Sequence, residues 1–304
     1  MKNISTIYKV LVVAVILAVL TTLGLISAHN GNNSDAGKVK VVAGENFWGN
    51  ITSQIGGNHV AVTSIISNPS TDPHLYESDA HNAAAISSAN LVIENGLGYD
   101  DFIDKIMATS PNSNRQVLSV EKTLNITGSD PNPHLWYDIP RVPVVAAAIE
   151  RALAAKDPAN SATYAANLKT FDNSLQPIIA VIDQIKSKYP AAPVAYTERV
   201  PGYLLADAGL SVKSPAGFAS AIEEGDDPSP ADTAAMDGLM TDHGVKVLLY
   251  NAQATSAVTQ HVRDLANQAG IPVIGVTETL PPADATYQAW QLAQANALLK
   301  ALGG

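Results

Sequence analysis

Two short segments of the chain share a pattern that could bind a metal ion. Residues 72–77 read Asp-Pro-His-Leu-Tyr-Glu, and residues 132–138 read Asn-Pro-His-Leu-Trp-Tyr-Asp. The proline before His74 and before His134 restricts the backbone, and the aromatic residue two positions later can pack inward, so each imidazole has a stiff support. A single Pro-His pair is more often an ordinary polar histidine. Two matching copies, each with carboxylates nearby that could orient the ring, favour metal ligands.

Two carboxylates in the second half of the chain occupy comparable positions. Glu198 follows a predicted strand over 193–196, and Glu278 follows one over 271–276. In α/β sheets, ligands bind outside the carboxyl ends of the strands. Because exposed carboxylates are common, two alternatives stay open: Glu198 pairs with Arg199 or another base, and Glu278 caps a helix or is solvated. Together with the two histidines, these carboxylates would form a site of four protein ligands with no open position for chemistry.

The elements that must position these residues alternate short apolar segments with helical stretches, which is typical of the α/β class. The predicted strands are 39–43, 60–66, 91–94, 116–120, 194–196, 245–250 and 273–276. Apolar residues recur every three or four positions over 157–189, which predicts a long helix between two lobes, with the metal site in the cleft between them. Pro177 lies inside this helix and predicts a kink there or a division into two helices.

The N-terminus carries an uncharged, apolar run from residue 10 to residue 27. This run predicts a signal peptide or an N-terminal membrane anchor over 1–28, followed by a flexible spacer over 29–38. The domain boundaries that follow are an N-terminal α/β lobe over 39–156, the long linking helix over 157–189 and a C-terminal α/β lobe over 190–304.

The amino-acid composition excludes several kinds of functional site. The 304 residues include 18 basic and 28 acidic side chains, a formal net charge of −10, which argues against a nucleic-acid-binding protein. The chain has no cysteine, which excludes disulfides, thiolate nucleophiles and lipid attachment to cysteine. Any metal must therefore be held by His, Asp, Glu or water. The sequence contains neither the His-Glu-x-x-His nor the Gly-x-Ser-x-Gly pattern, so we do not expect an enzyme.

With these motifs identified, residues 39–302 resemble the periplasmic or cell-surface substrate-binding proteins of zinc and manganese ABC transporters. The resemblance rests on segments 55–60, 72–77, 89–98 and 132–136, of which the second and fourth are the specific ones. It implies two α/β lobes joined by one long rigid helix, with the metal between them. The implied ligands are His74, His134, Glu198 and Glu278, although family members more often have Asp at the last position. A carboxylate at Glu198 resembles the manganese-type set, but a mixed His/carboxylate site also binds zinc.

The resemblance implies an extracytoplasmic receptor, in the periplasm or on the outer cell surface. Such a receptor captures one Zn²⁺ or Mn²⁺ per chain and delivers it to an ABC permease. We expect a monomer that binds no nucleic acid and meets the membrane only through its N-terminal segment. One alternative is a protein of the same architecture that binds a chelate such as a siderophore or cobalamin, for which 6% aromatic residues are few. A surface adhesin is a second alternative, which nothing in the sequence tests.

Overall fold

The computed structural model describes residues 35, 37–68, 76, 79–281 and 286–303. Residues Val39–Gly304 form one compact unit, and Met1–Lys38 is counted as another. The signal peptide or membrane anchor predicted over 1–28 and most of the spacer lie outside the described residues. Among the residues that are described, no helix combines the length and apolar character needed to cross a bilayer.

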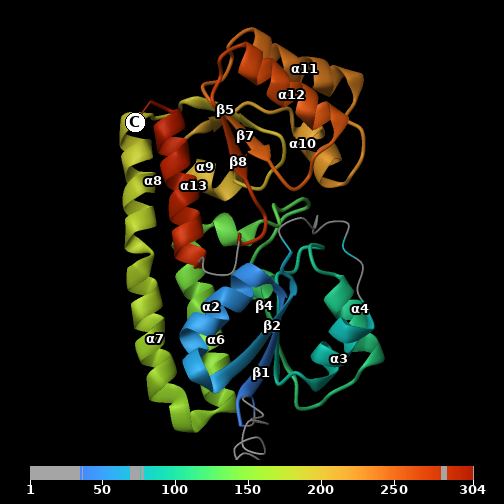
Figure 1. Ribbon diagram of the computed structural model, residues 1–304, viewed down its shortest axis with the longest axis vertical. Coiled ribbons are helices and arrows are strands. Elements are labelled where there is room, and N and C mark those ends of the chain that lie inside the picture. The colour runs from blue at the N-terminus through green and yellow to red at the C-terminus, as the bar shows by residue number, and fades with distance from the viewer. Residues whose placement is uncertain (1–34, 36, 69–75, 77–78, 282–285, 304) are drawn as a thin grey trace, which may run out of the picture. The chain divides into compact units, whose positions relative to one another are not determined.

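Two four-stranded parallel sheets organise the compact unit, and Figure 1 shows one in each half of the chain. The first has the order β2-β1-β3-β4, with β1 (Val39–Glu45), β2 (Val60–Ile66), β3 (Leu91–Glu94) and β4 (Gln116–Ser119). The second has the order β6-β5-β7-β8, with β5 (Pro193–Tyr196), β6 (Ser211–Val212), β7 (Leu248–Asn251) and β8 (Val273–Val276). The predicted α/β class is therefore confirmed.

The observed strands differ from the predicted ones in two places of the second sheet. Strand β7 starts at Leu248, whereas the prediction began at residue 245. Val245 and Val247 are buried just before the strand, which is why the apolar run in the sequence begins earlier than the strand does. Strand β6, which pairs with the start of β5, was not predicted, because two residues are too few to show an alternating pattern.

Helices connect or follow the strands in both halves. In the first half they are α2 (Asn46–Gly56), α3 (Ala80–Ser88), α4 (Phe102–Thr109), α5 (Val120–Thr123) and α6 (Val142–Lys156). In the second half they are α9 (Gly202–Asp207), α10 (Ala216–Glu223), α11 (Pro230–Thr241), α12 (Ala257–Gln268) and α13 (Tyr287–Ala301). Short 3₁₀ turns lie at Gly57–His59, Leu135–Tyr137, Ile139–Arg141 and Pro158–Asn160.

The span 157–189, predicted as one long helix, contains two helices in sequence. α7 (Ser161–Ser174) and α8 (Gln176–Lys188) are separated by Leu175. Pro177 lies in the first turn of α8, where its missing N–H needs no partner, so the division falls where this proline predicted it. Figure 1 shows α7 beside α2 and α6, and α8 beside α13. The division of the compact unit into lobes at residues 156 and 190 stays a prediction.

One hydrophobic core serves both sheets. Successive strand residues point to opposite faces, so in β1 Val41 and Ala43 join this core while Val42 joins a second one under α3 and α4. In β7, Leu249 joins the same shared core while Leu248 joins a third one under α11 and α12. The linking helices add the buried residues Tyr164, Phe171, Leu175, Ile178, Ile182 and Ile185 to the shared core. Apolar packing therefore runs without interruption from the first sheet to the second.

We expect a methyl group at Gly56 to destabilise the fold. Helix α2 ends against β2 so closely that a Cβ at Gly56 would lie 2.3 Å from Val60 Cγ1 and 2.9 Å from Val60 Cβ. Such overpacking costs about 2 kcal/mol, so Gly56→Ala should lower the free energy of unfolding by about that amount. Urea unfolding followed by circular dichroism measures it.

The matched control is Gly238→Ala in α11, where nothing lies within 4 Å of the added Cβ. Alanine is favoured over glycine in a helix by about 1 kcal/mol, so this variant should be as stable as the parent or more so. Equal unfolding midpoints for Gly56→Ala and the parent would contradict the close packing of α2 on β2.

Candidate metal centre

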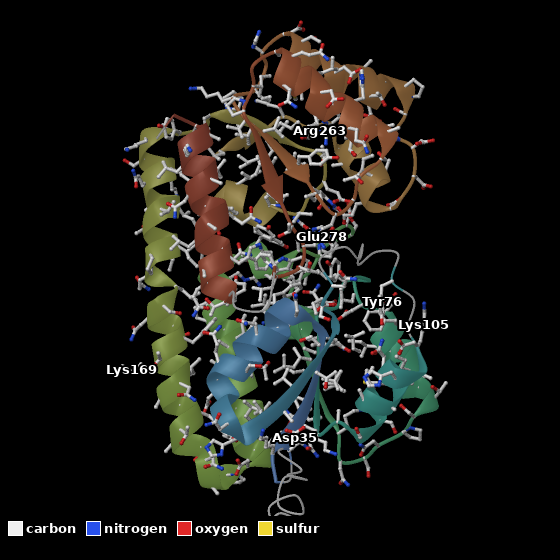
Figure 2. The ribbon with its side chains drawn as sticks, in the orientation of Figure 1. Asp35, Tyr76, Lys105, Lys169, Arg263 and Glu278 are labelled. Atoms are coloured by element: carbon white, nitrogen blue, oxygen red, sulfur yellow. The ribbon has the colours of Figure 1, made fainter. Side chains whose placement is uncertain are left out.

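The second sheet brings Glu198, Asn251 and Glu278 together at the carboxyl ends of its strands. In the register of this sheet, Leu249 of β7 lies opposite Tyr196 of β5, and Asn251, the last residue of β7, lies opposite Val276 of β8. Glu198 and Glu278 each follow two residues beyond their strands, on either side of Asn251. Strand order changes direction between β5 and β7, and this switch point is where open α/β sheets bind ligands. Figure 2 shows Glu278 just after β8, between the two sheets.

Asn251 connects the two carboxylates. Its Nδ2 donates a hydrogen bond to Glu278 Oε1 at 2.7 Å and another to Glu198 Oε2. The backbone N–H of Glu278 donates to Gln253 Oε1 at 2.5 Å, which holds the segment after β8 in place. The side chains of Glu198 and Glu278 are 1% and 0% exposed. The alternative that Glu278 is a solvated residue is therefore wrong.

Asn132 orients the ring of His134. Asn132 Nδ2 donates to the carbonyl oxygen of Arg199 at 2.8 Å, so its Oδ1 must be the atom that faces His134 Nδ1 at 2.6 Å. An amide oxygen can only accept, so Nδ1 carries a proton and donates, and in a neutral ring Nε2 is then the nitrogen with the lone pair. Tyr203 donates to the Asn132 carbonyl at 2.9 Å and further secures the segment. His134 is thus held in the tautomer that could bind a metal through Nε2.

His134 and Glu278 come together although they belong to different halves of the chain. His134 Nε2 lies 3.6 Å from Glu278 Oε2, and both side chains are fully buried. Tyr99 lies in the segment after β3, and its hydroxyl donates to the same Oε2 at 2.8 Å. Burial, and then the charge of Glu278, raises the pKa of the Tyr99 phenol well above its usual value. Tyr99 therefore keeps its proton and acts as a donor.

His74 lies outside the described residues, as does most of segment 72–77. Tyr76 from this segment is described, and its ring packs edge-on against Phe102 with the centroids 4.9 Å apart. Among the described residues, no three His, Asp or Glu side chains are grouped so that they could hold a metal ion. The ligand role of the four predicted residues, of which His74 is one, stays a prediction.

Sequence reasoning missed Asn251, Asn132 and Tyr99. Asn251 directly follows the predicted strand over 245–250, so its place at a strand end was a usable signal. Asn132 begins the second Pro-His segment, where its side chain precedes the ring that it orients. Tyr99 had no such signal, because its contact with Glu278 joins residues that are 179 positions apart.

Arg199 pairs with two carboxylates other than Glu198. Its Nε and Nη2 donate to the two oxygens of Glu223 at 2.8 and 2.9 Å, and Nη1 donates to Asp130 at 2.9 Å. Glu223 is the last residue of α10, and its side chain is buried. Arg199 therefore fastens the segment before His134 to α10 in the second half.

A second buried pair of carboxyl groups lies at the carboxyl end of the first sheet. Asp100 accepts hydrogen bonds from the backbone N–H groups of Asn95 at 2.6 Å and Gly96 at 2.8 Å. Burial raises the pKa of Asp100 to about 7 despite these donors. Glu45, the last residue of β1, is fully buried beside it, and burial followed by the charge of Asp100 raises the pKa of Glu45 well above its usual value. Burial therefore favours the protonated form of both carboxyl groups.

We expect Arg199→Met to lower the free energy of unfolding by about 3 kcal/mol, because it leaves the buried carboxylate of Glu223 without its partner. Equilibrium denaturation measures the change. The double variant Arg199→Met/Glu223→Leu removes both charges and should recover most of the loss. A double variant that is as unstable as the single one would show that the ion pair is not the cause.

We expect the Glu45 and Asp100 pair to make folding stability fall as pH rises. The folded-state pKa values are raised, so above about pH 4.5 the unfolded chain releases protons that the folded chain keeps. Each such proton costs about 1.4 kcal/mol per pH unit until the folded group ionises. Glu45→Gln should therefore lose less stability between pH 5 and pH 8 than the parent, as measured by urea unfolding. The control is Glu224→Gln at an exposed site, and identical losses in all three proteins would contradict the assignment.

Comparison with known proteins supports the fold and the family. The family model described as zinc-uptake complex component A, periplasmic, matches residues 41–301. One curated relative is the metal ABC transporter substrate-binding lipoprotein SsaB of Streptococcus sanguinis, 26% identical over 193 residues, which are 59% of this chain and 61% of the relative. Another is the manganese-binding lipoprotein MntA of Halalkalibacterium halodurans, 27% identical over 180 residues, 58% of this chain and 57% of the relative. These matches span about three fifths of each relative's length.

Solved structures agree on the architecture. The periplasmic zinc-binding protein TroA of Treponema pallidum superposes with a TM-score of 0.76 at 18% identity, covering 88% of this chain and 100% of the other. A Mn-bound periplasmic metal-binding protein of Candidatus Liberibacter asiaticus gives a TM-score of 0.71 at 22% identity, covering 86% and 98%. These likenesses establish the two-sheet fold. Because the family model extends over both sheets and the helices between them, the chain belongs to the family of the periplasmic zinc-uptake complex component A.

Proposed function

We propose that this protein is an extracytoplasmic receptor that captures a divalent transition metal ion, zinc or manganese, and delivers it to an ABC permease. The observation that carries the proposal is the contact between His134 and Glu278, whose Nε2 and Oε2 atoms lie 3.6 Å apart with both side chains fully buried. An imidazole and a carboxylate from opposite halves of the chain, which lie close together away from water, are the donors that such ions prefer.

The charges of the proposed ligand set suit a divalent cation. His74 and His134 would bind as neutral rings, and Glu198 and Glu278 would each supply one negative charge, which together balance the charge of the metal. The support of the ligands is already in place, since Asn132 holds the ring of His134 and Asn251 holds both carboxylates. Residues that orient metal ligands in this way change affinity by about 10- to 100-fold when they are removed.

We further propose that the protein binds its cargo without catalysis. Four protein ligands complete the tetrahedral shell of a zinc ion and leave no position for a reacting water. The relatives SsaB and MntA are named as a metal ABC transporter substrate-binding lipoprotein and a manganese-binding lipoprotein, which agrees with a receptor role. We expect a monomer that reaches the membrane only through the N-terminal segment.

The chelate-binding alternative is not favoured. A siderophore or cobalamin needs an open cleft lined by aromatic and basic side chains. Here His134, Glu198 and Glu278 are at most 1% exposed and are joined to Asn132 and Asn251 by hydrogen bonds. This close packing suits a bare ion better than a bulky chelate.

We expect the purified protein to bind one metal ion per chain and His134→Ala to weaken that binding by more than about 100-fold, beyond the usual effect of losing a supporting residue. The same loss is expected for His74→Ala. Titration calorimetry with zinc and with manganese, together with metal content by mass spectrometry, measures both quantities.

The control is His261→Ala. His261 is an exposed histidine that pairs with Asp237 at 3.1 Å on the outer helices of the second half. Its loss should leave binding unchanged. Circular dichroism checks that each variant is folded, and tight metal binding by folded His134→Ala would disprove the proposed site.

A further inference from the structure

Tyr99 is held in one position by its own backbone segment. Gly96, Leu97 and Gly98, which follow β3, all have positive φ values of 83°, 59° and 80°. This left-handed turn closes when the N–H of Tyr99 donates to the carbonyl of Gly96 at 3.2 Å. Positive φ is uncommon for leucine, so the surrounding contacts must hold the turn in this shape. The turn thus holds Tyr99 in the segment after β3, from which its hydroxyl reaches Glu278.

The ring of Tyr99 is fixed by the residues that surround His134. It lies 5.0 Å from the ring of Trp136 and meets the ring of His134 edge-on at 5.8 Å between centroids. Trp136 is fully buried and stacks on Phe47 at 4.0 Å, so it has no room to move. The hydroxyl of Tyr99 is therefore delivered to Glu278 by a rigid support.

Glu278 receives hydrogen bonds on both oxygens, from opposite halves of the chain. The Tyr99 hydroxyl donates to Oε2 at 2.8 Å, and Asn251 Nδ2 donates to Oε1 at 2.7 Å. Oε2 also lies 3.6 Å from His134 Nε2. A carboxylate held at both ends cannot turn about its last bond to present its two oxygens equally to one ion.

This restraint bears on which metal the site prefers. Zinc is satisfied by four ligands in a tetrahedron, whereas manganese prefers six ligands and oxygen donors. In a site of two imidazoles and two carboxylates, a higher coordination number is reached when the carboxylates bind through both oxygens. We propose, on the basis of the receptor function proposed above, that Tyr99 is a specificity-determining positioning residue that keeps Glu278 bound through one oxygen and so favours zinc over manganese.

Tyr99→Phe tests this role, because it removes the hydroxyl and keeps the ring that packs on Trp136. Competitive titration of the full-length protein should give a ratio of manganese to zinc dissociation constants that falls by about tenfold in the variant. A merely structural residue would weaken both metals alike and leave the ratio unchanged. An unchanged ratio would overturn the proposal.

The absorption spectrum of bound Co²⁺ is a second measurement, and its result for the parent does not depend on the stability of the variant. Four-coordinate Co²⁺ absorbs visible light far more strongly than five- or six-coordinate Co²⁺. The parent should show the strong four-coordinate spectrum, and Tyr99→Phe should show a weaker one. A weak spectrum from the parent would overturn the proposal even if the variant did not fold.

The matched control is Tyr164→Phe in α7. Tyr164 is also buried, and its hydroxyl donates to the carboxylate of Asp157 at 2.7 Å. Its metal ratio and Co²⁺ spectrum should match those of the parent, and a shift as large as that of Tyr99→Phe would overturn the specific role of Tyr99. If the parent binds no stoichiometric metal, the receptor function itself fails and this proposal with it. If the parent binds metal with an unchanged ratio in Tyr99→Phe, the role of Tyr99 alone fails.

Discussion

Two carboxylates removed from water, Glu198 and Glu278, impose the strongest demand on this structure. An ionised carboxylate in an apolar interior is costly unless donors surround it, and the fold supplies them from several directions. Asn251 serves both groups from β7, and Tyr99 reaches Glu278 from the segment after β3. The register of the second sheet and the turn after β3 place these donors next to the carboxylates. A cation placed among these groups would meet a site whose charge and hydrogen bonds are already arranged.

The shared core explains why these distances can be maintained across two sheets. Val41 in β1 and Leu249 in β7 belong to the same apolar cluster, which continues along α7 and α8. At the site itself, Tyr287 from α13 donates to the carbonyl of Trp136 at 2.5 Å, two residues beyond His134. Packing and hydrogen bonding thus tie the histidine segment to the second half of the chain. Contacts of this kind permit small local shifts more readily than a wide hinge opening.

Much of the fold was accessible from the sequence, because β1, β2 and β3 are short, mainly apolar runs followed by polar residues. Pro177 also marked the division between α7 and α8, since its ring is tolerated only in the first turn of a helix. Strand β6 was not predicted because its two residues are too few to show an alternating pattern. The ends of β5 and β8 pointed to Glu198 and Glu278, but periodicity could not reveal that Tyr99 meets Glu278 or that Glu223 is buried against Arg199. Such pairings depend on tertiary distances, and His74 still has no described position.

The two sheets have the same strand order, β2-β1-β3-β4 in one and β6-β5-β7-β8 in the other. Each half of the chain therefore has its own switch point in strand order, and the proposed ligands differ between the halves: nitrogen from the half of His134 and oxygen from the half of Glu198 and Glu278. In the proposed site, the type of donor atom in one half of the chain is therefore independent of the type in the other half. In the proposed site, a carboxylate of the second half could be exchanged for another ligand without altering the scaffold that presents the imidazole, so that metal preference would change while the architecture stayed constant.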